Sequence, residues 1–312
     1  MEDTPGNRGS RLFTAVDELD EAARALGWSI EYRQLGRGSF SAELASSECA
    51  GLHLAWERFD NHLHIPTGPP EGLVGVFLPD TSAGRVDASG RPLAEGDLVV
   101  FPPRSELEFV TRGEVRNATV FLTEAEFRTA ARALAPSRRA SLTGSATILR
   151  GDPRSFAAIR SRIARVHQAG RPDPEAASQL LARIVLWMAD AWSMTDAVEL
   201  ADGAAARVAR RVQSYIEDRF RGPIRMADLC AHVGHGLRTV QRAFASYFQL
   251  SPTGYITARR LNEARRALVA TDPASGTVTG IATESGFSHL GRFSVTYRAY
   301  FGESPSETLA AR

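Results

Sequence analysis

The spacing of apolar residues along this chain alternates between helical periodicity and short strand-like runs. Residues 13–26 place apolar side chains at near-helical spacing, which predicts an amphipathic helix. From residue 29 to 122, short apolar or alternating runs are bounded by Gly and Pro. They predict strands over 30–35, 52–59, 73–78, 98–101, 107–110 and 118–122. Many short strands at such regular spacing are typical of a small β-barrel or sandwich.

Helical spacing returns after residue 123 and predicts helices over 124–135, 153–169 and 174–194. The third of these carries more large apolar residues than an exposed surface helix does, among them Trp187 and Trp192. Such a helix buries two faces or contacts a partner chain. Residues 196–206 are small and acidic, and they are predicted to form a linker.

The last third of the chain contains one pattern twice. The sequence Tyr-Phe-x-x-Ser-Pro begins at Tyr247 and again, 53 residues later, at Tyr300. Each copy follows a short helical stretch, a glycine (Gly234 or Gly286) and a second helical stretch. The predicted helices cover 226–233, 237–248, 252–270, 278–285 and 289–301, with a short final helix after Ser304. This arrangement predicts two tandem helix-turn-helix units, whose second helices are shaped to enter the DNA major groove.

The charge distribution supports a nucleic-acid partner. Residues 204–312 contain 15 Arg and 8 acidic residues, so this segment carries +7 and the remainder carries −6. Such an asymmetry suggests a basic nucleic-acid-binding domain joined to an acidic one. In the helix predicted over 252–270, the arginines Arg259, Arg260, Arg265 and Arg266 are expected on the outer face.

Residues 204–312 resemble the DNA-binding domain of the AraC/XylS family of bacterial transcription regulators. The residues that carry this resemblance are 229–234, 238–244, 286–294 and 301–305. The match covers about a third of the chain. It implies a sequence-specific transcription regulator of the activator type, without enzymatic activity, that has an N-terminal sensor domain of the cupin kind.

The resemblance also implies which residues contact DNA. In the first unit, base contacts fall on Arg238, Gln241 and Arg242, with Thr239 beside them. In the second unit, the implied DNA-binding residues are Ser288, His289, Leu290, Gly291, Arg292, Val295 and Arg298. This second set departs from the more polar pattern of the family, because Leu290, Gly291 and Val295 have no hydrogen-bonding side chain. Its reading is therefore expected to be weak, or directed at thymine methyl groups and DNA shape. His235 also occupies a turn position that is usually apolar in the family.

Residues 90–103 resemble the second conserved hairpin of the cupin barrel. The predicted fold class is therefore α+β and multidomain, with a cupin-like β-barrel, a helical middle segment and an all-α domain with two helix-turn-helix motifs. The predicted domains are a disordered tail at 1–11, a sensor at 12–123, a helical dimerisation segment and linker at 124–200, and the DNA-binding domain at 201–312.

The barrel is not predicted to hold a metal ion or a cofactor. His62 and His64 are two residues apart and would share one face of a strand, as in a cupin metal motif. Glu71 is too far along the chain for that motif, and the hairpin at 90–103 has no His to complete a set of three or four ligands. Five aromatic residues are candidates for a ligand pocket or for simple core packing: Trp56, Phe59, Phe77, Phe101 and Phe109.

The expected partners are double-stranded operator DNA, RNA polymerase, a small-molecule effector and a second copy of the chain. No apolar run reaches the roughly 18 residues of a membrane helix, and residues 1–11 lack an apolar signal core. The two cysteines, Cys49 and Cys230, are expected to be free thiols in a cytoplasmic protein. Two alternatives stay open: a cupin-type metal enzyme fused to a DNA-binding domain, and a regulator whose barrel is only a dimerisation or interaction scaffold.

Overall fold

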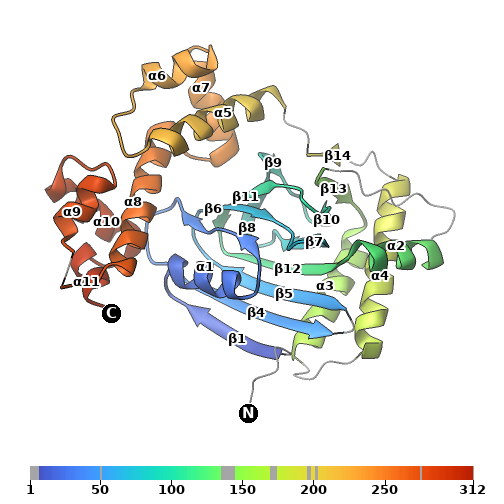
Figure 1. Cartoon of the computed structure of the whole chain (residues 1–312). Helices are drawn as coiled ribbons and strands as arrows, with labels where there is room; N and C mark the ends of the chain where they lie inside the picture. The colour runs from blue at the N-terminus through green and yellow to red at the C-terminus, as the bar shows by residue number, and fades with distance from the viewer. Residues whose placement is uncertain are drawn as a thin grey trace.

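The structure, a computed structural model, describes residues 7–49, 51–134, 145–168, 174–194, 198–200, 203–274 and 276–311. A sheet-rich N-terminal part is followed by an all-helical C-terminal part (Figure 1). Among the described residues, no helix has the length and apolar character that a membrane crossing requires.

The larger of the two sheets has eight antiparallel strands in the order β1-β4-β5-β12-β7-β10-β13-β14. Their bounds are β1 Asn7–Phe13, β4 Ala42–Cys49, β5 Leu52–Phe59, β7 Leu73–Asp80, β10 Asp97–Phe101, β12 Val115–Thr123, β13 Thr147–Arg150 and β14 Val198–Glu199.

The smaller sheet has the order β2-β6-β11-β8-β9, and β3 pairs with β6 beside β2. Its strands are β2 Ser29–Ile30, β3 Arg33–Gln34, β6 Leu63–Gly68, β8 Gly84–Ala88, β9 Arg91–Pro92 and β11 Leu107–Gly113. Helix α1 (Val16–Ala25) shares one apolar core with side chains from both sheets, which therefore enclose a common interior.

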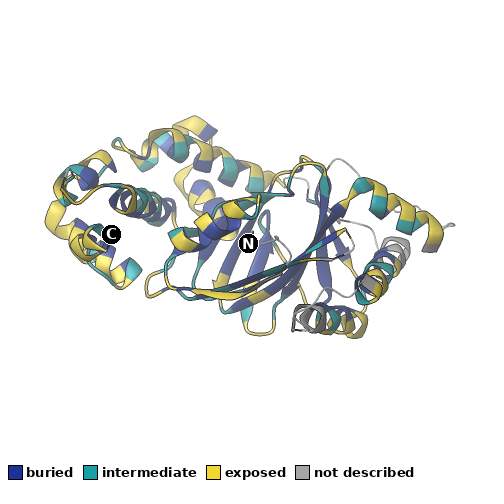
Figure 2. Cartoon of the chain, turned by 60° about the horizontal axis from the view of Figure 1, so that its bottom comes forward, coloured by how far each residue is buried: buried dark blue, intermediate teal, exposed yellow. Residues whose placement is uncertain are grey.

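The other face of the larger sheet is covered by α2 (Glu124–Leu134), α3 (Pro153–Gln168) and α4 (Pro174–Met194) (Figure 2). Strand β12 shows how the two faces are divided. Val120 packs with these helices, whereas its neighbours Thr119 and Phe121 line the interior between the sheets. Successive side chains of a strand point to opposite faces, so one strand serves two cores.

Two predictions about the N-terminal part were wrong. Residues 7–13 form β1, paired with β4, where a disordered tail over 1–11 was predicted. The polar sequence of β1 does not show the apolar pattern of a strand. An edge strand is held by backbone hydrogen bonds and needs few apolar side chains. The segment 124–200 is not purely helical either, since β13 pairs with β10. An apolar run of this length does not reveal its secondary structure by periodicity.

The helical part contains α5 (Ala204–Arg219), α6 (Met226–Val233), α7 (Leu237–Phe248), α8 (Pro252–Ala270), α9 (Val278–Glu284), α10 (Leu290–Phe301) and α11 (Pro305–Ala310). Between the helices of each pair, Gly234 and Gly286 adopt left-handed φ angles of 71° and 92°, as the predicted turns require. The hydroxyl of Ser251 accepts a hydrogen bond from the Gly254 amide at the start of α8, and Ser304 caps α11 in the same way.

Candidate nucleic-acid interface

Helix α7 buries one face and exposes the other. Val240, Ala243 and Phe244 are buried in the core of the helical part. The four predicted DNA-binding residues of the first helix pair, Arg238, Thr239, Gln241 and Arg242, are all exposed. Within the described part of the chain, the guanidinium groups of Arg238 and Arg242 form no hydrogen bond or ion pair. Both therefore remain available for an external partner.

Helix α10 has the same organisation but a different exposed surface. All seven predicted residues of the second pair are exposed, namely Ser288, His289, Leu290, Gly291, Arg292, Val295 and Arg298. The side chains of Val295 and Leu290 are 72% and 38% exposed, which is unusual for large apolar residues on a helix that buries Phe293 and Tyr297. The exposed face of α10 thus carries two large apolar side chains beside the cations Arg292 and Arg298.

The arginines of α8 lie elsewhere than the sequence predicted. Arg265 is 7% exposed and pairs with Asp17 and Glu303. Arg266 pairs with Glu31 of the sheet-rich part. The two remaining ones also bind protein groups: Arg259 pairs with Glu217 and Glu263, and Arg260 donates to the carbonyls of Phe220 and Gly222. The expectation of an outer arginine face on α8 was therefore wrong, because these side chains join α8 to its neighbours.

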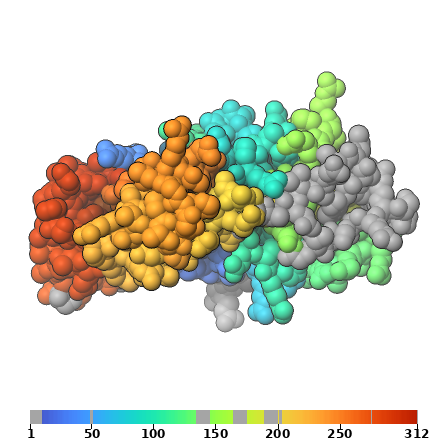
Figure 3. Space-filling model, turned by 90° about the horizontal axis from the view of Figure 1, so that it is seen from above, coloured from blue at the N-terminus to red at the C-terminus, as the bar shows by residue number. Residues whose placement is uncertain are grey.

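Helix α8 is docked against β3 of the smaller sheet. The Gln34 amide donates to Asn262 Oδ1 at 3.0 Å, and Asn262 Nδ2 donates to the Gln34 carbonyl at 2.8 Å. The Gln34 side chain reaches the second helix pair as well, since its Nε2 donates to the Tyr300 carbonyl at 2.5 Å. Figure 3 shows the helical part, gold to red, lying directly against the cyan and teal surface of the sheet-rich part. One short strand thus contacts both α8 and α10.

The two candidate metal ligands face the helical part. His62 Nε2 donates to the Phe248 carbonyl at 2.9 Å, and burial lowers the pKa of His62 to about 4. His64 is fully buried, with Nε2 at 3.2 Å from Glu108 Oε2 and Nδ1 at 3.3 Å from the Tyr255 hydroxyl. Burial opposes ionisation of Glu108, yet His64 lowers its pKa to about 2. No group of three or more ligand side chains within the described ranges could hold a metal ion.

The interior between the sheets contains a narrow cavity of about 30 Å³. Four of the five candidate aromatic residues line it: Phe59, Phe77, Phe101 and Phe109. Trp56 does not, because it lies within β5 next to Glu57 and its side chain points to the opposite face of the strand. Sequence reasoning missed the other lining residues, Trp28, Ile30, Tyr32, Glu57, Ile65, Thr67, Gly68, Thr111, Asn117, Thr119 and Phe121. The one usable signal was Glu57, two residues before Phe59 on the inward face of an apolar strand.

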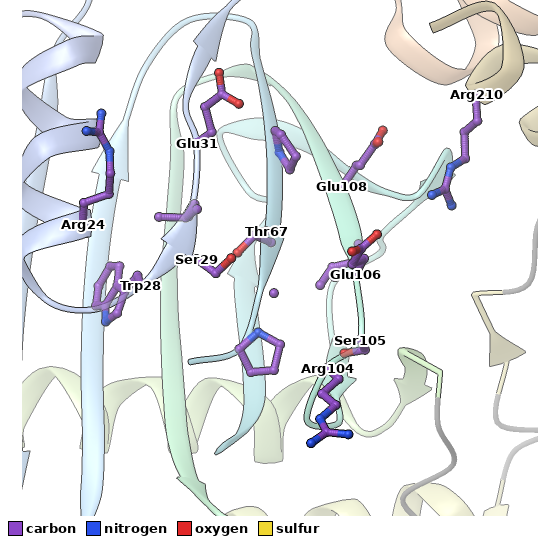
Figure 4. Close-up of a pocket in the computed structure, with 15 residues that line it drawn as sticks. Arg24, Trp28, Ser29, Glu31, Thr67, Arg104, Ser105, Glu106, Glu108 and Arg210 are labelled. Carbon is purple, nitrogen blue, oxygen red and sulfur yellow. The ribbon is translucent and has the colours of Figure 1, made fainter. Parts of the chain in front are cut away.

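A larger outer pocket of about 700 Å³ adjoins this cavity (Figure 4). The two share Trp28, Ile30, Thr67 and Gly68, so these residues lie where the spaces meet. The remaining wall includes six charged residues, namely Arg24, Glu31, Arg104, Glu106, Glu108 and Arg210. Arg210 extends from α5, so the helical part contributes to the rim of this pocket.

Known proteins resemble this chain in its C-terminal third. A family profile described as a helix-turn-helix domain matches residues 229–311. A "Probable thc operon regulatory protein" of Rhodococcus erythropolis is 36% identical over 102 residues, and a "XylDLEGF operon transcriptional activator" of Pseudomonas putida is 36% identical over 101. These matches cover 33% and 32% of this chain and 31% of each relative. The chain therefore matches less than a third of the length of these relatives.

Among solved structures, a probable AraC family transcriptional regulator from Rhodopseudomonas palustris CGA009 is 39% identical. The match covers 34% of this chain and 96% of that one, with a TM-score of 0.32. The sequence similarities and the exposed faces of α7 and α10 identify the helical part as a DNA-binding helix-turn-helix domain. In this domain the chain is similar to transcription regulators of the AraC/XylS family.

Proposed function

We propose that the whole protein is a sequence-specific transcription activator, with a cupin-like sensor in its sheet-rich part and two helix-turn-helix readers in its helical part. The observation that carries this proposal is the exposure of Arg238, Arg242 and Arg292 on two matching helices, inside the region that the helix-turn-helix profile matches. Exposed arginines without protein partners on such helices have the chemistry to bind guanine edges.

The two readers differ in what they recognise. On α7, Arg238, Gln241 and Arg242 present donors and acceptors that fit guanine and adenine edges in the major groove. On α10, Leu290 and Val295 present methyl groups, which fit the thymine methyl. The first reader therefore specifies bases by hydrogen bonds, and the second reads thymines and DNA shape around the polar contacts of Arg292 and its neighbours.

Gly291 supports a close approach of DNA to α10. A Cβ added at Gly291 would meet no atom of the protein within 4 Å, and its φ is not left-handed. Neither packing nor backbone conformation explains a glycine at this second residue of α10. We infer that the space beside Gly291 is filled by DNA in the complex.

The remaining parts follow from the same proposal. The sheet-rich part with α2–α4 is the sensor, and α4 supplies the contact to a second copy, since Leu186 on it is 42% exposed. DNA, RNA polymerase and a small-molecule effector are the proposed partners. An enzymatic role has no support, because His62 and His64 bind protein groups from α7, β11 and α8.

The test is selection of the preferred DNA sequence from a random library, followed by binding of Arg242→Ala. We expect this variant to lose about 1–3 kcal/mol of specific binding and its preference at one base position. The matched control is Arg128→Ala, an exposed arginine of α2 paired with Glu124, which should bind like the parent protein. Equal weakening on the selected and on random DNA would make Arg242 a phosphate contact.

A further inference from the structure

Five polar side chains line the inner cavity without lining the outer pocket. They are Tyr32, Glu57, Thr111, Asn117 and Thr119, and their exposed fractions are 1%, 6%, 1%, 2% and 6%. The Tyr32 hydroxyl donates to Glu57 Oε1, and Asn117 Nδ2 donates to Glu57 Oε2 at 2.7 Å. Glu57 is therefore fixed as a hydrogen-bond acceptor at the deep end of the cavity.

Two further polar atoms at this end are buried without a partner. Among the described residues, Asn117 Oδ1 and the Thr111 hydroxyl oxygen find no hydrogen bond. A buried polar atom that is left unsatisfied costs about 1–3 kcal/mol, so native proteins seldom leave one without water, an ion or a ligand. Both residues line the cavity. This end of the cavity thus offers acceptors to a donor from outside the chain.

The cavity contains aromatic faces and a carboxyl group, but no cation lines it within the described residues. Burial raises the pKa of Glu57, its hydrogen bonds with Tyr32 and Asn117 oppose this, and no basic side chain contributes. An unpaired buried carboxyl group is driven toward its neutral form, so a cationic ligand beside Glu57 would stabilise the ionised form, and aromatic faces attract cations. Trp28 and five phenylalanines supply such faces around Glu57.

We propose that the inner cavity binds a small organic amine in its protonated form. Its ammonium group donates to Glu57, to Asn117 Oδ1 and to the Thr111 hydroxyl, while its apolar stem lies against the aromatic rings. The three N–H donors of an ammonium group match these three acceptors. The inference rests on the proposed function, in which this amine would be the effector.

A carboxylate ligand does not fit the same site. It would place a second negative charge beside Glu57, which disfavours the ionised form of both groups. It would also leave Asn117 Oδ1 unpaired, because a carboxylate has no hydrogen to donate. A neutral alcohol has one donor and no charge, so it satisfies only one of the three acceptors at a time.

The two adjoining spaces set the shape of the ligand. A volume of about 30 Å³ admits only a head group of roughly the size of one or two waters. The stem therefore extends past Trp28 toward the outer pocket, where Arg210 of α5 lies on the rim (Figure 4). A ligand of that length lies between the strands and α5, which links its binding to the position of the helical part.

Isothermal titration of the full chain tests the proposal with two matched sets of probes. These are n-butylamine, 1-butanol and butyrate, and benzylamine, benzyl alcohol and benzoate. We expect saturable binding of an amine, about tenfold or more tighter than the alcohol with the same stem, and no binding of the carboxylate. Equal affinity for amine and alcohol, binding of a carboxylate, or binding of neither amine would overturn the proposal.

Three variants locate the site. Glu57→Gln should weaken amine binding about tenfold or more and leave alcohol binding within about threefold. Thr111→Val should weaken amine binding about three- to tenfold without lowering the Tm, because its hydroxyl has no protein partner to lose. Ser47→Ala is the matched control, since it removes a buried unpaired hydroxyl outside the cavity. If Glu57→Gln does not fold, Thr111→Val still tests the site. An unchanged amine affinity of Thr111→Val would refute the site.

The binding test and the test of the proposed function are independent. The titration contains no DNA, and the DNA selection contains no amine. Selected DNA without amine binding would refute this inference alone. Amine binding without a preferred DNA sequence would refute the proposed function and leave the amine site standing.

Discussion

Gln34 and Asn262 hold each other through both backbone groups of Gln34, although 228 residues separate them in the sequence. Gln34 is 1% exposed and Asn262 is 3% exposed, so water cannot replace either hydrogen bond. The carboxamide of Asn262 makes the two hydrogen bonds to β3 that the backbone of a neighbouring strand would make. The sheet-rich part and α8 are therefore joined by an interaction that tolerates little displacement.

Replacing Asn262 by Leu tests this junction. The Gln34 amide and carbonyl would both stay buried without a partner, so we expect the free energy of unfolding to fall by about 2–4 kcal/mol. Urea unfolding of the full chain measures the change. Gln179→Leu on α4, where the amide is exposed, should stay within about 0.5 kcal/mol of the parent. A similar small effect for Asn262→Leu would show that the junction opens freely.

The histidine beside α7 predicts a dependence of stability on pH. The folded protein holds His62 neutral, with a pKa of about 4 against about 6.5 when unfolded. The unfolded chain therefore binds the extra proton between these values, and stability falls as the pH drops from about 6.5 toward 4. The contribution of His62 to this loss is up to about 3 kcal/mol.

His62→Gln isolates that contribution, because it removes the titrating group and retains a hydrogen-bond donor. The difference in unfolding free energy between parent and variant should shrink as the pH falls through this range. Asp20, whose pKa burial raises to about 6, titrates in both proteins and cancels in the difference. A difference that stays constant with pH would mean that the pKa of His62 is the same in the folded and the unfolded protein.

Gly291→Ala should separate stability from DNA binding. The added methyl group meets no protein atom, so we expect the variant to be more stable by about 0.4–1 kcal/mol. Its affinity for the selected DNA should fall, because the methyl group occupies space that DNA needs. Thermal unfolding and a DNA titration give the two values. A more stable variant with unchanged DNA affinity would show that DNA does not approach α10 at this residue.

The two readers should differ in sharpness. A scan of every base substitution across the selected DNA should find the strongest preferences under α7, where Arg238 and Arg242 are free. Preferences under α10 should be weaker and should favour thymine, because Leu290 and Val295 offer only apolar contact. Equally strong base preferences under both helices would mean that Arg292 and His289 contribute more to base recognition than we propose.

The sequence predicted local structure better than it predicted contacts. Gly234 and Ser251 mark a turn and a helix start by their own chemistry, and the structure has both where they were expected. The faces of α7 and α10 followed from helical spacing in the same way. Such features depend on residues close together in the chain, so a single sequence contains their signal.

Contacts between distant residues left no such signal. The spacing of His62 and His64 resembled a cupin metal motif, although no metal was predicted there, and the sequence did not indicate that their partners come from α7, β11 and α8. Arg265 was expected to be exposed, but it pairs with Asp17, which lies 248 residues away in the sequence. The polar end of the inner cavity could not be predicted from the sequence for the same reason, since Thr111 and Glu57 come from different sheets.

Helix α8 also has a fixed length, because its 19 residues at about 1.5 Å each extend about 28 Å. It connects the two helix pairs, so the fixed length of this helix sets the distance between them. One turn of DNA measures about 34–36 Å, or about 10 base pairs. If both helix pairs bind DNA as proposed, the two halves of the binding site are expected to lie on one side of the double helix at a constant phase. An insertion of about five base pairs between them would turn one half away.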